Sequence, residues 1–413
     1  MGTTITISHI GPITNEVRLD LKKINLIIGP QSSGKSTIMK IVCFCRYVEK
    51  YCIVHDDTKY YGTYKHFIKE LQRFHKLPDS FFNSKSYIKY EGEWIRIEYK
   101  HEQNKCNARI KPQSGKKLKD ADNVKLCFLP SERNMVAVFR NIESEYRVKI
   151  MDNLFNFINE WDEIKRYYNR DRSLPMPFLS GMEFYYDSKN GKEVLKIAGD
   201  KTIPPFFASS GVQSSMPMYV MIDYLTDKVF KHRPSLTRSY LNELMVQIMR
   251  EEGMLTTKEF TEETVKVLNT RLKQRLEYHG SHIFIEEPEQ NLFPKAQQEL
   301  IFDIAQKINV ACSDNKESSL FLTTHSPYIV TAFNLLINAA KAYAKSTKKS
   351  EKIIPQSRII PLDQISAYYI NGETGVFKSI VDQEIGMLGG DELDSASDYI
   401  EEMTAKLYDI IYD

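Results

Sequence analysis

The sequence has 413 residues, of which 42% are hydrophobic and 27% charged, and its formal net charge is +2. This length allows one large core with insertions or two to three smaller domains. The near-zero charge excludes a uniformly basic nucleic-acid coat, although local patches can cancel in the sum. The six cysteines form no C-x-x-C pair or zinc-like cluster, and no apolar run reaches the roughly 18 residues that span a bilayer. We therefore expect a cytoplasmic protein without membrane contacts.

Residues 3–28 predict a strand, a turn and a second strand that runs from Val17 through Ile28. Such a hairpin at the start of the chain favours a mixed sheet. Residues 36–51 then form a densely apolar helical segment, which is typical of a helix buried on most sides.

The motif between this strand and this helix, Gly29 to Ser36, reads GPQSSGKS and matches G-x-x-x-x-G-K-[ST] completely. The two glycines let successive N–H groups turn toward phosphates, and the helix directs its positive end there. Lys35 would reach the outer phosphates of ATP, and the Ser36 hydroxyl would bind its Mg²⁺. The residues predicted to contact the nucleotide are Gly29, Pro30, Gln31, Ser32, Ser33, Gly34, Lys35, Ser36 and Thr37.

Residues 56–120 predict a small helical lid followed by an antiparallel sheet, with alternation strongest over 86–112. The short apolar strand 124–130 then leads into Ser-Glu-Arg-Asn. Arg133 at this strand end could sense phosphate or a neighbouring subunit, and a structural pair with Glu132 is an equal alternative.

Two further segments carry weaker signals. Asn190-Gly191 predicts the turn of a hairpin, and the Ser-rich stretch 208–215 opens a helix, as either an anion site or an ordinary N-cap. Residues 231–279 predict a helical insertion whose end carries basic side chains. These side chains form a solvated face, with nucleic-acid phosphates as the alternative partner; they are Lys266, Arg271, Lys273 and Arg275.

Two predicted apolar strands, near residues 282 and 320, end in polar side chains that can bind a metal ion or take part in catalysis. The first ends in Glu286 and Glu287, and the second presents His325. Carboxylates at such a strand end are expected beside the phosphate loop on a neighbouring strand, where one binds Mg²⁺ and the other orients water. His325 is expected at the γ-phosphate.

These motifs together resemble an ABC-type ATPase head. Four motifs occur in the order of that class: the phosphate loop, ASSGVQ at 208–213, IEEPEQNLFP at 285–294 and TTHSP at 323–327. Their sequences resemble those of the OLD-like ATPases of prokaryotic defence systems. The resemblance implies an α/β fold: a P-loop ATPase head with a mixed sheet flanked by helices, an antiparallel β subdomain and a helical insertion. It implies an ATPase domain over 1–340 and a C-terminal α/β extension with an acidic helical tail over 341–413, which caps the domain or docks a partner.

The resemblance also implies roles for individual residues. Glu286 takes the Mg²⁺-associated position, Glu287 the water-activating one, and His325 is the switch histidine. Four further residues fall on the signature sequence, namely Ser209, Ser210, Gly211 and Gln213. In the family this sequence completes the nucleotide site of an opposing subunit. The resemblance therefore implies a homodimer or higher homo-oligomer that sandwiches ATP between subunits.

The sequence departs from the ABC pattern at three places. The signature lacks one of the usual glycines, Phe293 stands where relatives commonly have a histidine, and the stretch around Arg133 is the best substitute for the Q-loop. A fused TOPRIM nuclease is not expected, because D-x-D is missing after residue 328. An effector of the nuclease kind is then expected on a separate polypeptide, as in the PARIS and Septu types.

The primary hypothesis is a Mg²⁺-dependent ATPase that senses a signal and regulates this separate effector in anti-phage defence. One alternative is a DNA-repair or chromosome-maintenance head resembling RecF and SMC proteins, supported by the basic segment near 271–275. Another is a nucleotide-gated scaffold with little turnover. Membrane transport is disfavoured because no membrane segment is found.

Overall fold

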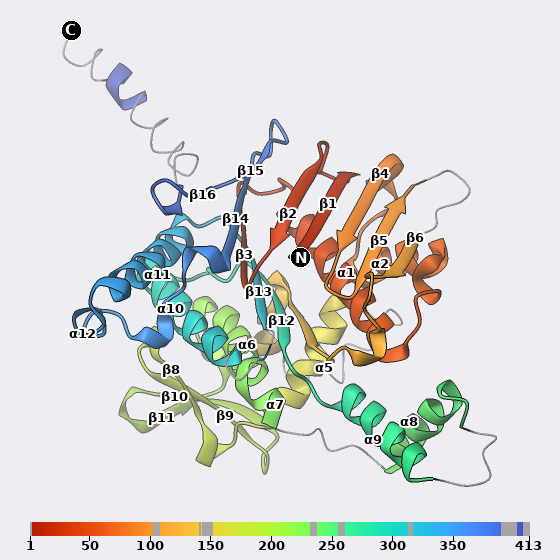
Figure 1. Cartoon of the computed structure of the whole chain (residues 1–413). Helices are drawn as coiled ribbons and strands as arrows, with labels where there is room; N and C mark the ends of the chain where they lie inside the picture. The colour runs from red at the N-terminus through yellow and green to blue at the C-terminus, as the bar shows by residue number, and fades with distance from the viewer. Residues whose placement is uncertain are drawn as a thin grey trace.

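The computed structural model describes most of the chain and arranges it as an α/β fold with one mixed sheet and further antiparallel sheets (Figure 1). Within the described residues, no helix is long and apolar enough to cross a membrane. The predicted acidic tail from Asp391 lies largely outside these residues. The structure describes residues 2–101, 108–139, 142, 152–231, 238–254, 261–312, 316, 318–389 and 403–407.

The central sheet has six strands in the order β15-β14-β3-β13-β12-β7. The strands β14, β3, β13, β12 and β7 run parallel, and β15 is antiparallel to β14. β3 and β12 are buried along their whole length, as expected for parallel strands covered on both faces. The strand bounds are β3 Ile24–Ile28, β7 Lys125–Leu129, β12 Ser281–Glu286, β13 Ser319–Thr324, β14 Ile365–Ile370 and β15 Phe377–Ser379.

A second, antiparallel sheet has the order β2-β1-β4-β5-β6. It confirms the antiparallel strands predicted within 86–112. The single strand predicted from Val17 to Ile28 is wrong, because the chain turns at Lys22 and passes into the central sheet. The Asn25 side chain closes this turn by accepting from Lys22 N and donating to Lys22 O, both at 2.8 Å. The bounds are β1 Thr3–Ile10, β2 Val17–Leu21, β4 Phe82–Glu91, β5 Ile95–Lys100 and β6 Ala108–Pro112.

Two smaller sheets complete the strands. The hairpin predicted at Asn190-Gly191 is confirmed by β9 and β10, which belong to a four-stranded antiparallel sheet. A two-stranded sheet lies near the end of the described chain. The bounds are β8 Leu174–Met176, β9 Met182–Asp187, β10 Lys192–Ile197, β11 Lys201–Ile203, β16 Val381–Asp382 and β17 Met387–Leu388.

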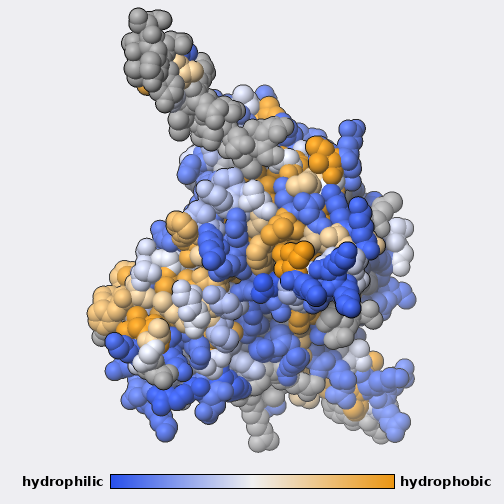
Figure 2. Space-filling model, turned by 90° about the vertical axis from the view of Figure 1, so that its left-hand side faces the viewer, coloured by the Kyte–Doolittle hydropathy of each residue, from blue (hydrophilic) through white to orange (hydrophobic). Residues whose placement is uncertain are grey.

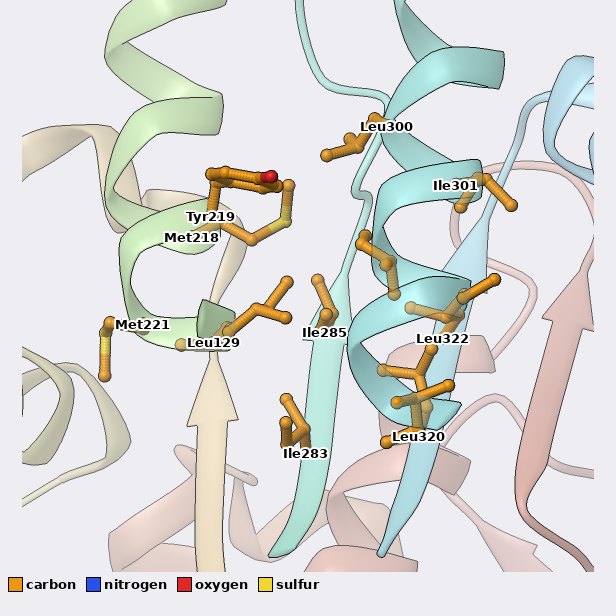
Figure 3. Close-up of a cluster of buried hydrophobic side chains, with 14 of the residues drawn as sticks. Leu129, Met218, Tyr219, Met221, Ile283, Ile285, Leu300, Ile301, Leu320 and Leu322 are labelled. Carbon is orange, nitrogen blue, oxygen red and sulfur yellow. The ribbon is translucent and has the colours of Figure 1, made fainter. Parts of the chain in front are cut away.

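The helices cover the two faces of the central sheet, and alternation along the strands decides which helix each side chain meets. Phe284 and Phe321 pack with α1 and the antiparallel sheet. Ile285 and Leu322 point the other way, toward α6 and α10 (Figure 3). The helix bounds are α1 Lys35–His55, α2 Tyr64–His75, α3 Met135–Val138, α5 Asn153–Lys165, α6 Ser210–Asp223, α7 Val229–Lys231, α8 Arg238–Glu251, α9 Glu262–Leu276, α10 Pro294–Ala311, α11 Pro327–Lys345 and α12 Thr347–Ser350.

The segment predicted as a helical insertion contains α8 and α9, which lie apart from the central sheet in Figure 1. The two helices pack against each other through their own small cluster, formed by Leu244, Ile248 and Leu268.

A face of the main body, seen in Figure 2, carries hydrophilic residues interspersed with exposed hydrophobic areas.

The C-terminal part of the described chain returns to the central sheet. β14 pairs in parallel with β3, the strand that enters the phosphate loop, with Ile365 opposite Ile24. The boundary predicted at residues 340 and 341 falls inside α11. How the chain divides into domains stays a prediction, but a strand beyond that boundary supports the phosphate loop.

Candidate nucleotide-binding site

The phosphate loop has the expected context, because β3 ends at Ile28 and α1 begins at Lys35. Gly34 has φ +103°, in the region that favours glycine. A Cβ atom at Gly29 would lie 2.3 Å from the carbonyl oxygen of Ile370 on β14, so this position has no room for a side chain. Pro30, Gln31 and Ser32 are exposed. The remaining residues predicted to touch nucleotide are buried or half-buried, namely Gly29, Ser33, Gly34, Lys35, Ser36 and Thr37.

Lys35 turns back onto the loop from which it starts. Its Nζ donates to the carbonyl oxygens of Gly29 at 2.8 Å and Pro30 at 2.5 Å, and lies 3.4 Å from Ser33 Oγ. Burial lowers the pKa of Lys35 to about 8, against the opposing effect of Glu287 and Glu289. The Lys35 ammonium group is therefore hydrogen-bonded to loop oxygens, and the oxygens of a bound phosphate would take their place.

Glu286 is the last residue of β12 and is 5% exposed. Its carboxylate has two contacts at long range: Ser131 N donates to Oε2 at 3.3 Å, and Lys40 Nζ lies 3.9 Å from Oε1. These contacts leave most of its acceptor capacity for a cation. Mg²⁺ is usually held by one or two protein oxygens together with phosphates and waters, so the Glu286 carboxylate and the Ser36 hydroxyl have the donor chemistry that the predicted metal site needs.

Glu287 and His325 are paired across two strand ends. Glu287 Oε1 lies 2.8 Å from His325 Nε2, and His325 Nδ1 lies 3.2 Å from the Gly29 carbonyl oxygen. The hydrogen bond to His325 lowers the pKa of Glu287, and the same bond raises the pKa of His325. Both ring nitrogens face acceptors, which is the arrangement that favours a protonated imidazole.

The order of the strand ends differs from the prediction. Glu286 and Glu287 were expected on a strand next to the phosphate loop, but β13 lies between β3 and β12. His325 therefore stands between the loop and the two carboxylates. This order allows its ring to reach Gly29 O on one side and Glu287 on the other.

Glu289 was missed at the sequence level, although it is the third carboxylate of the EEPE stretch. Its Oε1 accepts from Thr324 Oγ1 at 2.7 Å and from His325 N at 2.8 Å. It therefore orients the backbone that carries His325. Two buried oxygens at these strand ends, Glu289 Oε2 and Thr323 Oγ1, have no hydrogen-bond partner among the described residues. Polar atoms left in this way are consistent with a site built for a polar ligand.

The predicted signature residues lie at the start of α6. Ser209 is the N-cap residue, and Gly211 is so close to residue 291 that a Cβ atom would lie 2.6 Å from its carbonyl oxygen. Gln213 Nε2 donates to the carbonyl oxygens of Phe206 at 2.9 Å and Pro205 at 3.3 Å. These contacts join the signature to residues just before it and to the segment after Glu287.

Arg133 is fully buried at the end of β7, in the short helix Ser131–Asn134. Its guanidinium group donates to the backbone carbonyl oxygens of four residues, Pro130, Ser214, Glu286 and Glu287. The predicted structural pair with Glu132 is not seen, because these acceptors are main-chain atoms and Glu132 instead accepts from Ser131 Oγ. A role at a phosphate or at a neighbouring subunit stays a prediction. Phe293, the other unusual position, is 78% exposed at the start of α10.

Two of the four basic residues predicted at the end of the insertion have acidic partners. Arg271 Nε donates to Glu252 at 2.6 Å, and Arg275 is paired with Glu251. Both arginine side chains are largely buried, at 11% and 6% exposure. The prediction that these two arginines form a solvated face is therefore wrong, and their charge is already neutralised. Lys266 and Lys273 are exposed on α9.

No protein-family model matches the sequence, and no curated protein matches it. Solved structures do match. The SMC head domain from Thermotoga maritima is 11% identical over 92% of this chain and 98% of that chain, with a TM-score of 0.36. An Smc head domain from Pyrococcus furiosus, bound to the C-terminal domain of ScpA, is 10% identical over 97% and 98%, with a TM-score of 0.37.

The recombination mediator protein RecF also matches, with 9% identity over 92% of this chain and 98% of that chain and a TM-score of 0.32. The chain's own strands give the α/β fold with its mixed and antiparallel sheets. The three matches have TM-scores below 0.4, so they assign neither a role nor a sequence family. The functional reading depends on the residues of the site.

Proposed function

We propose that the chain is a Mg²⁺-dependent ATPase of the ABC type. The observation that carries this proposal lies at the ends of β3, β12 and β13, where Lys35 and His325 both contact the Gly29 carbonyl and His325 also contacts Glu287. The ends of parallel strands are where open α/β sheets bind ligands. Bound ATP and Mg²⁺ would supply the reactive γ-phosphate and neutralise its charge.

The residues of the chain divide the remaining work. Lys35 leaves the loop carbonyls and binds the outer phosphates, and Ser36 and Glu286 hold the metal ion. Glu287 has a lowered pKa and is ionised at neutral pH, so it can accept a proton from the attacking water. His325 holds one oxygen of that carboxylate and orients it.

The substitution Glu287→Gln tests this assignment. It keeps the shape of the side chain but removes the base, so we expect ATP binding to persist while kcat falls by about 100-fold or more. Phosphate release and binding of a fluorescent ATP analogue separate the two effects. Glu98→Gln on β5, a half-buried position in another sheet, is the matched control. Unchanged turnover in Glu287→Gln would exclude the proposed base.

We further propose that the signature residues Ser209, Ser210 and Gly211 complete the site of a second copy. This proposal is supported by their location at the start of α6, where backbone N–H groups attract phosphate, and by their place in the ABC motif order. ATP should then convert Glu287→Gln from monomer to dimer in analytical ultracentrifugation. A monomer at saturating ATP would contradict the shared site.

For the wider role, we propose that the ATP-dependent contact regulates a separately encoded effector, as the wording of the OLD-like motifs suggests. The second candidate is an ATPase that acts on DNA, and its support is the pair of exposed lysines on α9. Lys266 and Lys273 are exposed and can meet phosphate, whereas Arg271 and Arg275 are paired.

Hydrolysis measured with and without duplex DNA separates these two roles. Stimulation that is lost in the double variant Lys266→Gln/Lys273→Gln favours the DNA role. A hydrolysis rate that is unaffected by DNA but changes when the product of a neighbouring gene is added favours the effector role.

A further inference from the structure

The buried guanidinium group of Arg133 joins two parts of the molecule that the proposed function assigns to different nucleotides. Its Nη1 donates to the Glu286 carbonyl at 2.6 Å and Nη2 to the Glu287 carbonyl at 2.6 Å. Its Nε donates to the Ser214 carbonyl at 2.9 Å, within α6. One planar group therefore holds both the strand end that carries the base and the helix that carries the signature.

The backbone of Glu287 needs such support. Glu287 has φ +46°, a left-handed conformation that a residue with a side chain keeps only when its surroundings hold it. Its N–H donates to the Thr323 carbonyl at 2.9 Å, and its carbonyl accepts from Arg133. The direction of the Glu287 side chain thus depends on both of these bonds.

The signature helix is held to the same segment at a second point. Asn291 Nδ2 donates to Ser214 Oγ at 3.1 Å, and the Asn291 carbonyl closes on Gly211. Ser214 therefore meets Arg133 through its main chain and Asn291 through its side chain. A shift of the start of α6 would be transmitted to Glu287 through these contacts.

We propose that Arg133 is a positioning residue that couples the two nucleotide sites of a dimer through each subunit. This inference rests on the proposed function, in which Glu287 serves the subunit's own ATP and Ser209 to Gly211 serve the ATP of the other copy. Engagement of α6 by the second nucleotide sets the geometry of Glu287 at the first. Hydrolysis is then cooperative in ATP, and Arg133 carries that cooperativity.

Arg133→Lys tests the coupling, because lysine keeps the charge but lacks the planar fork that reaches several carbonyls at once. We expect the Hill coefficient for hydrolysis to fall toward 1 and kcat to fall about tenfold or more, since small misplacements of a catalytic group are costly. Binding of the ATP analogue should stay within about threefold of the wild type, because Arg133 makes no contact with the phosphate loop among its described bonds. A role in packing alone would lower activity and binding together.

Asn291→Ala provides a second variant at an exposed position, with a smaller change expected in the same direction. It decides the question alone if Arg133→Lys does not fold. Arg358→Lys is the matched control. Arg358 also joins two elements, because it donates to Asp303 at 2.8 Å, but this bond involves neither Arg133 nor Glu287.

Three results would overturn the inference: non-cooperative hydrolysis by the wild type, an unchanged Hill coefficient in Arg133→Lys, or, where that variant does not fold, an unchanged coefficient in Asn291→Ala. All three leave the ATPase assignment intact. A wild-type protein that neither binds nor hydrolyses ATP would instead contradict the proposed function itself.

Discussion

The carboxyl end of the parallel sheet and the α8–α9 insertion both carry many charged side chains, but these charges have different partners. In the insertion, Arg271 and Arg275 are neutralised by Glu252 and Glu251. At the sheet end, the hydrogen bonds of Lys35 go to its own loop, at two carbonyls and Ser33 Oγ, and Glu286 has two long contacts. Charge alone therefore does not identify a site. Charged and hydrogen-bonding groups without a strong partner inside the protein are the better indicator of a ligand site.

The largest expected effect comes from removing the charge at the sheet end. In Lys35→Ala, the outer phosphates lose the ammonium group that we propose binds them, so we expect ATP affinity to fall by about 100-fold or more. Isothermal titration with ATP and Mg²⁺ measures the change. Lys273→Ala removes an exposed charge from the insertion and should leave the affinity unchanged. Equal losses in the two variants would remove the contrast between the regions.

A smaller effect is expected from breaking a charge pair in the insertion. Arg271→Gln removes the 2.6 Å bond to Glu252 and the 3.7 Å contact with Asp56. We expect a loss of about 1–2 kcal/mol in the free energy of unfolding, because the Glu252 carboxylate is left partly buried without its partner. Urea denaturation measures the loss, with Lys266→Gln as the exposed control. A drop in ATP affinity without a loss of stability would show that the arginine acts on the site.

The smallest effect concerns the pH dependence of the Glu287 and His325 pair. The raised pKa of His325 stabilises the fold below its ordinary value of 6.5, and this contribution is lost as the pH rises through the folded-state pKa. The lowered pKa of Glu287 adds stability above 4.5, which is lost as the pH falls through its folded-state value. The wild type should exceed His325→Gln in stability most between about pH 4.5 and 6.5.

This pH-dependent difference should be about 1 kcal/mol or less, because both side chains are partly exposed, at 24% and 35%, and solvent screens the pair. Thermal unfolding across pH 4.5 to 9, without nucleotide, measures it. A difference that grows above pH 7 would have the wrong sign for a protonated His325.

Local patterns in the sequence were sufficient for several elements. The strand, loop and helix around Lys35 follow from an apolar run, two glycines and a helical period. The hairpin at Asn190-Gly191 follows from its turn residues. Other features needed contacts distant in the chain. The break at Lys22 depends on a side-chain turn at Asn25, and no apolar pattern marks it.

The role of Arg133 shows the same limit at the level of the site. An arginine after a buried strand is equally compatible with a ligand, a partner subunit or an ion pair. Its four acceptors are main-chain carbonyls, and three of them belong to residues 81 and more than 150 positions away. Every residue has such a carbonyl, so no residue type could have identified them.

The sequence by itself predicted which groups act on a nucleotide: Lys35, Ser36, Glu286, Glu287 and His325 were proposed from motifs whose spacing is set by a single strand end or loop. Only the tertiary structure decided how these groups are ordered and held. It placed β13 between β3 and β12, brought β14 against the phosphate loop, and joined Glu287 to α6 through Arg133. The physical reason is that local chemistry is encoded in neighbouring residues, whereas strand order and main-chain hydrogen bonds depend on the packing of the whole chain.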